Sequence, residues 1–365
     1  MNPDHKSEKN QSEVGHAGAE SSERSADETR SERRGEDTSF ARDIRRRLNG
    51  IPCRLIMYKT VTSTNDEAKR LLVDALRAPG DGSAAEQPLC GTPCGVTEAA
   101  DGHPSKDPPH DSPFGTIIIA DEQTAGRGRR GRAFASPAAD SVYLSFILQP
   151  ITAANTLLVT IMAAVAVCEA VEKVTAGEPA IKWVNDIYLN GRKICGILAE
   201  AISGICSGTI HSASTDQKQN DCGIDGVILG IGVNINVPPH DFPEEIRDTA
   251  DSVSINPRDR GLFTAELIER VIEGYEGLTR GVSPIPAYRE RSFIIDSEII
   301  IVGYDDTETP AVAEDIADDG SLIVRYPDGS KESLNSGEVR VRRIRVSCAA
   351  SRVRRYAVTE AQIIE

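Results

Sequence analysis

The chain has 365 residues, with 41 Lys and Arg against 56 Asp and Glu, for a formal net charge of −15. A chain of this length buries enough apolar surface for roughly two or three domains, so disulfides or a structural metal are not needed for stability. The acidic balance argues against general binding to nucleic acid, which depends on clustered Lys and Arg.

No apolar run approaches the ~20 residues of a membrane-spanning helix, and the N-terminus resembles neither a signal peptide nor a transit peptide. We therefore expect a cytoplasmic protein without membrane contact. The eight cysteines include no C-x-x-C pair, which favours reduced structural thiols over a metal site. Only Cys90 and Cys94, four residues apart, keep a metal or redox role open.

The first part of the chain, residues 1–39, contains no Ile, Leu, Phe, Tyr or Trp and is rich in charged residues and Ser. We expect it to be a disordered polar tail, because it cannot bury enough apolar area to offset its chain entropy. Order is expected to begin near Phe40. The run Arg45–Arg47 favours a solvated helix end over a phosphate contact.

A first strand is predicted at residues 53–58, where apolar and polar residues alternate. A helix follows, because Thr64 and Glu67 have the spacing of a capping box and apolar residues then recur on one face up to Leu76. Residues 79–113 are rich in Gly, Pro and Asp. We expect them to form a long insertion that the core does not need.

From Gly115 onward, apolar runs alternate with polar breaks, as in a sheet with packed helices. Strands are predicted at 116–120, 141–149, 180–183, 194–201 and 227–236, helices at 152–175 and 262–292, and an insertion at 203–225. After Ser292, short apolar runs are separated by Asp-Asp-Gly and Pro-Asp-Gly turns, which predicts a small barrel. Its strands are expected at 298–303, 311–317, 321–326 and 339–345.

The most informative segment is residues 121–132, directly after a predicted buried strand. Its three glycines supply backbone freedom and exposed amides, and its four arginines supply permanent charge and bidentate donors for phosphate or carboxylate. Apolar strands on both sides distinguish it from Gly/Arg tails that bind RNA, and it lacks the Lys-Ser/Thr ending of a Walker A loop. The segment predicts an anion-binding loop.

A second polar cluster lies in residues 182–198, around an Asn-Gly turn typical of a hairpin. Two lysines, an amide and a carboxylate in this segment are expected to converge on one sheet edge. Trp183 is the only tryptophan of the chain, and filling the core is an equally good interpretation of it.

These motifs, taken together and in this order, resemble the biotin protein ligases, also called biotin–[acetyl-CoA-carboxylase] ligases. The resemblance rests on Ser63–Asn65, Gly126–Arg132, Lys182–Asp186, Lys193–Leu198 and Gly230–Asn236. It implies an α+β protein, with a class II synthetase-like catalytic domain of mixed β-sheet and helices followed by a small SH3-like β-barrel. The expected divisions are a tail at 1–39, a catalytic domain at 40–292, the barrel at 293–346 and a tail at 347–365.

The resemblance also implies the reaction of a ligase that uses ATP, biotin and Mg2+. Biotin and ATP would give biotinyl-5'-AMP, whose acyl group then passes to a lysine of a biotin carboxyl carrier domain. Uniting two anions and then polarising a carbonyl requires the kinds of residue present here.

Residue roles are likewise implied by the resemblance. Those assigned to biotin are Ser63, Thr64, Asn65, Gln123, Gly126, Arg127, Lys193 and Gly196. Those assigned to ATP and the adenylate are Arg129, Arg132, Phe134, Lys182, Asn185, Asn234 and Arg342. The catalytic residues would be Arg129, Lys193 and Asp186, with Asp186 also near a metal ion.

The sequence departs from the family pattern at two positions. Val184 stands where the family usually has proline, which alters backbone rigidity before Asn185 without removing a functional group. Phe134 stands where the family commonly has Trp to cover the adenine, and Phe offers less stacking area and no indole donor.

Other interpretations stay open. Ser63 and Thr64 also fit a helix cap, Asp186 a hairpin residue, and Lys182 and Lys193 solvated strand ends. A lipoate or octanoate ligase on the same scaffold would require an Arg-Arg-x-x-Gly-Gly-Gly element, which the chain lacks. A DNA-binding repressor would require a winged helix-turn-helix that residues 1–39 cannot form. A biotin-binding regulator without ligase activity would be expected to lose the phosphate arginines, and a homodimer is left open.

Overall fold

The computed structural model describes residues 39–77, 112–136, 141–152, 155–205, 211–214, 223–303 and 305–343. The expected C-terminal tail, nearly all of the expected N-terminal tail and of the insertion at 79–113, most of the one at 203–225, and Cys90 and Cys94 lie outside these residues. No helix in the described ranges has the length and apolar character needed to cross a membrane.

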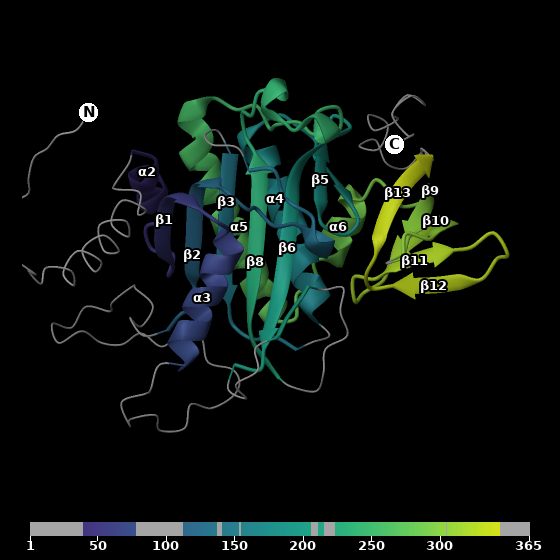
Figure 1. The fold of residues 1–365 in the computed structure, drawn as a ribbon, viewed down its shortest axis with the longest axis horizontal. Helices are drawn as coiled ribbons and strands as arrows, with labels where there is room; N and C mark the ends of the chain where they lie inside the picture. Colours follow the sequence, from purple (N-terminus) through teal and green to yellow (C-terminus); the bar gives the residue numbers. More distant parts are fainter. Residues whose placement is uncertain are drawn as a thin grey trace, which may run out of the picture.

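A mixed sheet of eight strands forms the centre of the molecule (Figure 1). Its order is β1-β2-β3-β8-β6-β5-β4, with β7 paired to β6. β1 and β2 run parallel and the other neighbours antiparallel. The strands are β1 (Arg54–Val61), β2 (Thr116–Gln123), β3 (Ser141–Leu148), β4 (Ala180–Lys182), β5 (Asp186–Leu189), β6 (Arg192–Ser203), β7 (His211–Ser214) and β8 (Ile224–Asn234).

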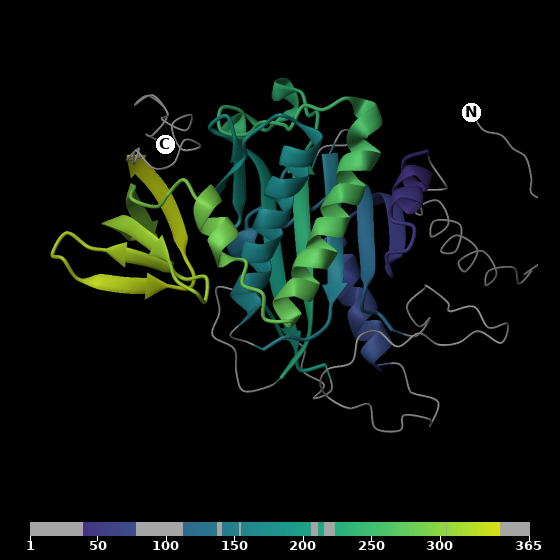
Figure 2. The same cartoon turned by 180° about the vertical axis from the view of Figure 1, so that it is seen from behind.

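Helices cover both faces of this sheet, which explains why β3 is buried along its whole length. α3 (Thr64–Arg77) lies on one face, and α4 (Thr156–Val174) and α5 (Arg260–Thr279) lie on the other (Figures 1 and 2). α4 has apolar residues all round and is buried over most of its length, as expected for a helix between a sheet and other helices. α2 (Ser39–Arg47) packs on α5.

The helix predicted at 262–292 is instead two helices, α5 and α6 (Ile285–Arg291). The break has a local cause, because Gly281 adopts a φ of +84° and Pro284 follows it. A left-handed residue and a proline both end a helix. The apolar spacing continues across the break, so periodicity alone did not reveal it.

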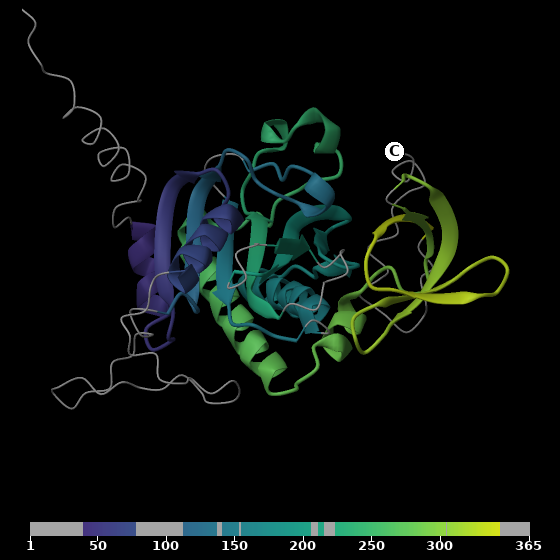
Figure 3. The same ribbon diagram turned by 60° about the horizontal axis from the view of Figure 1, so that its bottom comes forward.

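The C-terminal strands form a separate antiparallel sheet, here called the small sheet, in the order β12-β11-β10-β9-β13. They are β9 (Glu298–Val302), β10 (Glu308–Ile316), β11 (Leu322–Arg325), β12 (Lys331–Leu334) and β13 (Glu338–Arg343). β12 was not predicted, because its residues are mostly polar and exposed and so show no apolar pattern. The small sheet lies beside α6 (Figure 3).

Trp183 and Arg289 make two of the contacts that join the small sheet to the rest of the chain. Trp183 Nε1 donates to the carbonyl oxygen of Gly320 at 3.0 Å, and Trp183 is only 3% exposed. The Arg289 guanidinium on α6 donates to Asp315 at 3.0 Å. The small sheet therefore reaches the edge of the central sheet at which β4 and β5 lie.

α3 is held on the sheet by a cluster that includes Leu72, Ile118, Ile147 and Ile228. Leu72 is fully buried, whereas Leu76, one turn further along the same helix, is 37% exposed. The first turn of α3 carries Thr64 and Asn65, so this cluster also sets where those side chains lie.

We predict that Leu72→Ala lowers the free energy of unfolding by about 2–5 kcal/mol, because it removes buried methyl groups and leaves a cavity. The exposed Leu76→Ala should change it by less than about 0.5 kcal/mol. Urea denaturation of the two variants measures both effects. Equal losses in the two variants would contradict the packing described for α3.

Candidate functional site

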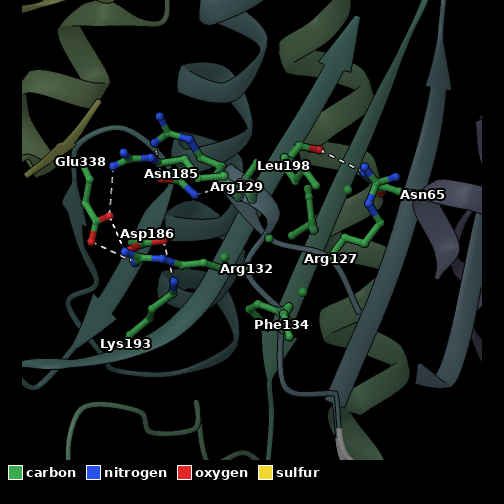
Figure 4. A pocket seen from close by; sticks show the side chains of 18 of the residues that line it. Asn65, Arg127, Arg129, Arg132, Phe134, Asn185, Asp186, Lys193, Leu198 and Glu338 are labelled. Atoms are coloured by element: carbon green, nitrogen blue, oxygen red, sulfur yellow. Dashed lines mark hydrogen bonds and ion pairs between the residues drawn. The ribbon is translucent and has the colours of Figure 1, made fainter. Parts of the chain in front are cut away.

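A pocket opens on the face of the sheet that carries α3, between the Gly/Arg loop (Gly126–Arg132), the central sheet and the start of β13 (Figure 4). Its lining includes most of the residues that the sequence singled out. These are Ser63, Thr64, Asn65, Gln123, Arg127, Arg129, Arg132, Phe134, Lys182, Asn185, Asp186, Lys193 and Gly196.

One end of the pocket is a hydrogen-bonded polar cluster of uncharged side chains. Gln123 Oε1 accepts from the backbone N of Thr64 at 2.8 Å and from its hydroxyl at 3.1 Å. Gln123 Nε2 donates to Ser136 Oγ at 3.0 Å. The Ser145 hydroxyl lies 2.8 Å from Thr64 Oγ1 and 2.6 Å from Asn65 Oδ1. The side chains at this end are thus oriented before any ligand binds.

The helix cap at this end differs from the predicted one. The amide of Asp66 donates to the Ser63 hydroxyl at 3.4 Å, so Ser63 caps α3. Glu67 does not complete a capping box with Thr64, because its carboxylate accepts from the Tyr58 hydroxyl at 2.6 Å. Thr64 is already engaged with Gln123, a partner that is distant in sequence.

The floor of the pocket is formed by glycines on paired strands. Gly196 on β6 faces Gly232 on β8 in register. A Cβ at Gly232 would lie 2.6 Å from the Phe134 ring, and one at Gly230 would lie 2.1 Å from Asn65 Oδ1. Side chains larger than hydrogen at these positions would displace Phe134 and Asn65 from the sheet. Gly230 and Gly232 carried no individual role in the sequence analysis.

The opposite end is cationic. Lys193 Nζ lies 2.7 Å from Asp186 Oδ1. Burial alone would raise the pKa of Asp186, but the Lys193 and Lys182 ammonium groups outweigh it and hold that pKa below its ordinary value. Burial lowers the pKa of Lys182, and Asp186 opposes this shift. The carboxylate therefore stays ionised between two lysines.

The arginines of the loop contact the small sheet as well as the pocket. Arg129 donates to Asn185 Oδ1 at 2.9 Å and to the Gly337 carbonyl at 3.1 Å. Arg132 forms a two-pronged pair with Glu338, at 2.9 and 2.6 Å. Arg130, which was given no role, donates to the Gly303 carbonyl at 2.6 Å. The small sheet is therefore a wall of this pocket.

Three predicted residues do not line the pocket. Gly126 lies behind it, where a Cβ would come within 2.5 Å of Ser136 Oγ. Asn234 is buried and its amide donates to the Asp251 carbonyl at 3.1 Å. Arg342 lies in a separate groove of the small sheet with Tyr326.

Glu338, rather than Arg342, is the residue of β13 that faces the loop arginines. Four residues along a strand span about 13 Å, which carries Arg342 away from the pocket. The sequence offered no signal for choosing between them, because both lie in the same short strand.

The described residues contain no group of three or more His, Cys, Asp or Glu that could hold a metal ion. The predicted metal residue Asp186 is surrounded by Lys193, Lys182 and Arg129. These cations already compensate its charge, so the residues present do not fit a metal held by the protein at Asp186.

Free thiols are found at Cys53, Cys168 and Cys195. The peptide bond between Trp183 and Val184, where the family usually has proline, is cis.

Residues 105–214 match the model of the Biotin/lipoate A/B protein ligase family, and residues 295–342 match that of the Biotin protein ligase C terminal domain. The biotin–[acetyl-CoA-carboxylase] ligase of Paracoccus denitrificans is 31% identical over 234 residues, which are 61% of this chain and 88% of that protein. The corresponding ligase of Mycobacterium tuberculosis is 30% identical, over 62% of this chain and 78% of that protein. This chain belongs to the biotin protein ligase family.

Other relatives define the extent of the likeness. The bifunctional ligase/repressor BirA of Bacillus subtilis is 36% identical over 48% of this chain, and the match spans about half, 51%, of that protein. The structure of the biotin protein ligase from Aquifex aeolicus with biotin and ATP aligns at a TM-score of 0.53 and 22% identity, over 80% of this chain and 99% of that one. The family resemblance and the class II synthetase-like fold with a small C-terminal antiparallel sheet are thus confirmed.

We predict that Lys193→Met raises the pKa of the Asp186 carboxyl, because it removes the nearest cation while burial remains. Carbon-13 NMR titration of the aspartate side chains measures this shift. Lys173→Met, at an exposed position on α4, serves as the control and should leave that titration unchanged. An Asp186 carboxyl that titrates alike in Lys193→Met and the unchanged protein would contradict the described pair.

Proposed function

We propose that this chain attaches biotin to a lysine of a biotin carboxyl carrier domain, with biotinyl-5'-AMP as the intermediate. The observation that carries the proposal is a single pocket with a neutral, hydrogen-bonded end, a glycine floor and a cationic end. Biotin has the matching character, with a ureido ring of donors and an acceptor at one end and a carboxylate at the other.

In the proposed binding mode, the ureido ring lies at the neutral end beside Ser63, Thr64 and Gln123. Hydroxyl and amide groups there supply donors and acceptors whose orientation is already set. The acyl chain would follow the floor past Gly196 toward Lys193, which lies at the cationic end. The carboxylate would then meet a lysine and the arginines of the loop.

The first step joins biotin to the nucleotide. A carboxylate oxygen attacks the α-phosphorus of ATP, a phosphorus–oxygen bond forms, and the bond to pyrophosphate breaks. Negative charge grows on the transferred group and the leaving group, where Arg129 and Lys193 would stabilise it. Arg132 is paired with Glu338 in this structure and would exchange that carboxylate for phosphate oxygens.

The second step transfers the acyl group. The lysine amine attacks the biotinyl carbonyl, a carbon–nitrogen bond forms, the bond to the phosphate oxygen breaks and AMP leaves, while the amine proton passes to water. Asp186 has a lowered pKa and is therefore a weak base. We assign it to steering the incoming lysine rather than to removing its proton.

Phe134 is proposed to face the adenine, as the family resemblance implies. The position of Phe134 supports this role, because its ring lies over Gly196 and Gly232 and lines the pocket. The same ring packs edge-on against Tyr143. Asn185 and Lys182 lie at the same end as Arg129 and are proposed to bind the nucleotide. The adenylate role of Asn234 and the ATP role of Arg342 stay predictions from the resemblance.

Other parts of the proposal rest on the sequence and the family. Mg2+ is proposed to arrive with the ATP phosphates, which suit a cation that keeps much of its water shell. The carrier domain is proposed as the acceptor. A cytoplasmic location, the absence of nucleic-acid binding and the division into domains at residues 40–292 and 293–346 stay predictions, and a homodimer stays open.

The decisive experiment incubates the purified chain with biotin, ATP, Mg2+ and a carrier domain, and determines the carrier mass by mass spectrometry. We expect one biotinyl group per carrier, none without ATP, and none on a carrier whose acceptor lysine is replaced by arginine. Lys193→Ala should slow adenylation by about a hundredfold or more, because it removes a fixed charge at the developing anion. A carrier that the unchanged chain leaves unmodified would refute the proposal.

We predict that Arg129→Gly releases biotinyl-5'-AMP from the pocket, because the side chain closes the pocket between Asn185 and the small sheet. The freed intermediate should then label lysines on bystander proteins such as serum albumin, which mass spectrometry detects. Arg325→Gly, on β11 away from this pocket, is the control and should label only the carrier. Labelling confined to the carrier in both variants would remove Arg129 from this role.

A further inference from the structure

Glu200 is a buried carboxylate behind the neutral end of the pocket. It lies on β6, is 4% exposed, and does not line the pocket. One of its oxygens accepts from Asn65 Nδ2 at 2.9 Å, and the other accepts from the Arg127 guanidinium at 3.1 Å. Both donors do line the pocket.

This carboxylate joins two elements of the pocket through a buried contact. Asn65 lies in the first turn of α3, and Arg127 lies in the Gly/Arg loop. A buried ionised carboxylate is costly unless its partners satisfy it, so these two side chains are held to it. Arg127 also pairs with Asp66 of α3, but Asp66 is far more exposed than Glu200.

The effect of Glu200 extends to the residues proposed to meet the ureido ring. Asn65 Oδ1 accepts from the Ser145 hydroxyl, whose oxygen also lies 2.8 Å from Thr64 Oγ1, and the backbone N of Thr64 donates to Gln123. A continuous path of hydrogen bonds therefore runs from Glu200 to Gln123 behind the neutral end. Moving Asn65 would disturb the far end of that path as well.

We propose that Glu200 is a positioning residue for biotin binding, acting through Asn65 and Arg127 without touching the ligand. The proposal rests on the proposed function, since it names the end of the pocket that takes the ring. The effect of replacing Glu200 is expected to be specific, because Glu200 lies behind the neutral end and is held there by Asn65 and Arg127. Biotin binding should therefore depend on it more than ATP binding does.

The test compares Glu200→Gln with the unchanged chain in pyrophosphate exchange, with biotin and ATP varied separately. Glutamine keeps the shape but removes the charge and turns one acceptor into a donor that faces another donor. We expect the KM for biotin to rise roughly ten- to hundredfold, as for a lost charge-assisted contact, with the KM for ATP within about threefold.

Glu172→Gln is the matched control for loss of a partly buried ion pair. Glu172 on α4 pairs with the partly buried Arg291 at 3.2 and 3.1 Å, and neither residue lines the pocket. This variant should lower the melting temperature but leave the KM for biotin unchanged. A comparable rise in that KM in Glu172→Gln would show a general stability effect and overturn the proposal.

An unchanged KM for biotin in Glu200→Gln, or equal rises for biotin and ATP, would also overturn it. Should Glu200→Gln fail to fold, calorimetry of biotin binding to Glu200→Asp decides instead. The shorter side chain keeps the charge but shifts its position, so weaker binding supports the positioning role and unchanged affinity refutes it. Failure of the unchanged chain to modify the carrier would refute the proposed function itself, whereas an active chain with an indifferent Glu200→Gln refutes only this inference.

Discussion

Repulsion among the guanidinium groups of the Gly/Arg loop is the physical constraint on which this structure depends. Four arginines within six positions need nearby anions or carbonyl oxygens if they are to share one loop. The fold supplies partners from β6, from Asn185 in the hairpin, from the end of β9 and from β13, where Arg130 and Arg132 share Glu338. The loop is thereby spread across the pocket mouth, and its charges face the space between the two sheets.

The second requirement is a flat surface on which a ligand can lie. Gly196 and Gly232 are paired across two central strands, and their lack of side chains leaves room for Phe134 directly above them. The strands themselves are largely buried, because α4 packs on their other face. Catalytic groups placed on such a scaffold need little reorganisation when charge develops.

Much of the fold followed from local pattern. The alternating first strand, the apolar β3 and α4, and the turn-rich C-terminal strands carry their periodicity in the sequence, because each element buries one or both of its faces. The break before α6 and the polar strand β12 were missed. The first depends on a backbone conformation at Gly281, and the second pairs through backbone groups while its side chains face water.

The motifs also carried most of the site, because the loop and the hairpin bring residue types with one chemical purpose close together in the chain. Roles that depend on distant partners were not recoverable in this way. Ser63 rather than Thr64 caps α3, since Thr64 is held by Gln123, which lies 59 positions away. The choice of Glu338 over Arg342 depends on which end of β13 meets the loop.

The sequence by itself therefore determined most of the elements, the family and the chemical character of the two ends of the pocket. Those properties depend on residue type and on spacing within a single segment. Only the tertiary structure decided which charges are paired, which glycines form the floor, and that the buried Glu200 joins α3 to the loop. Pairing and burial are relations between segments far apart in the chain, and packing alone brings those segments together.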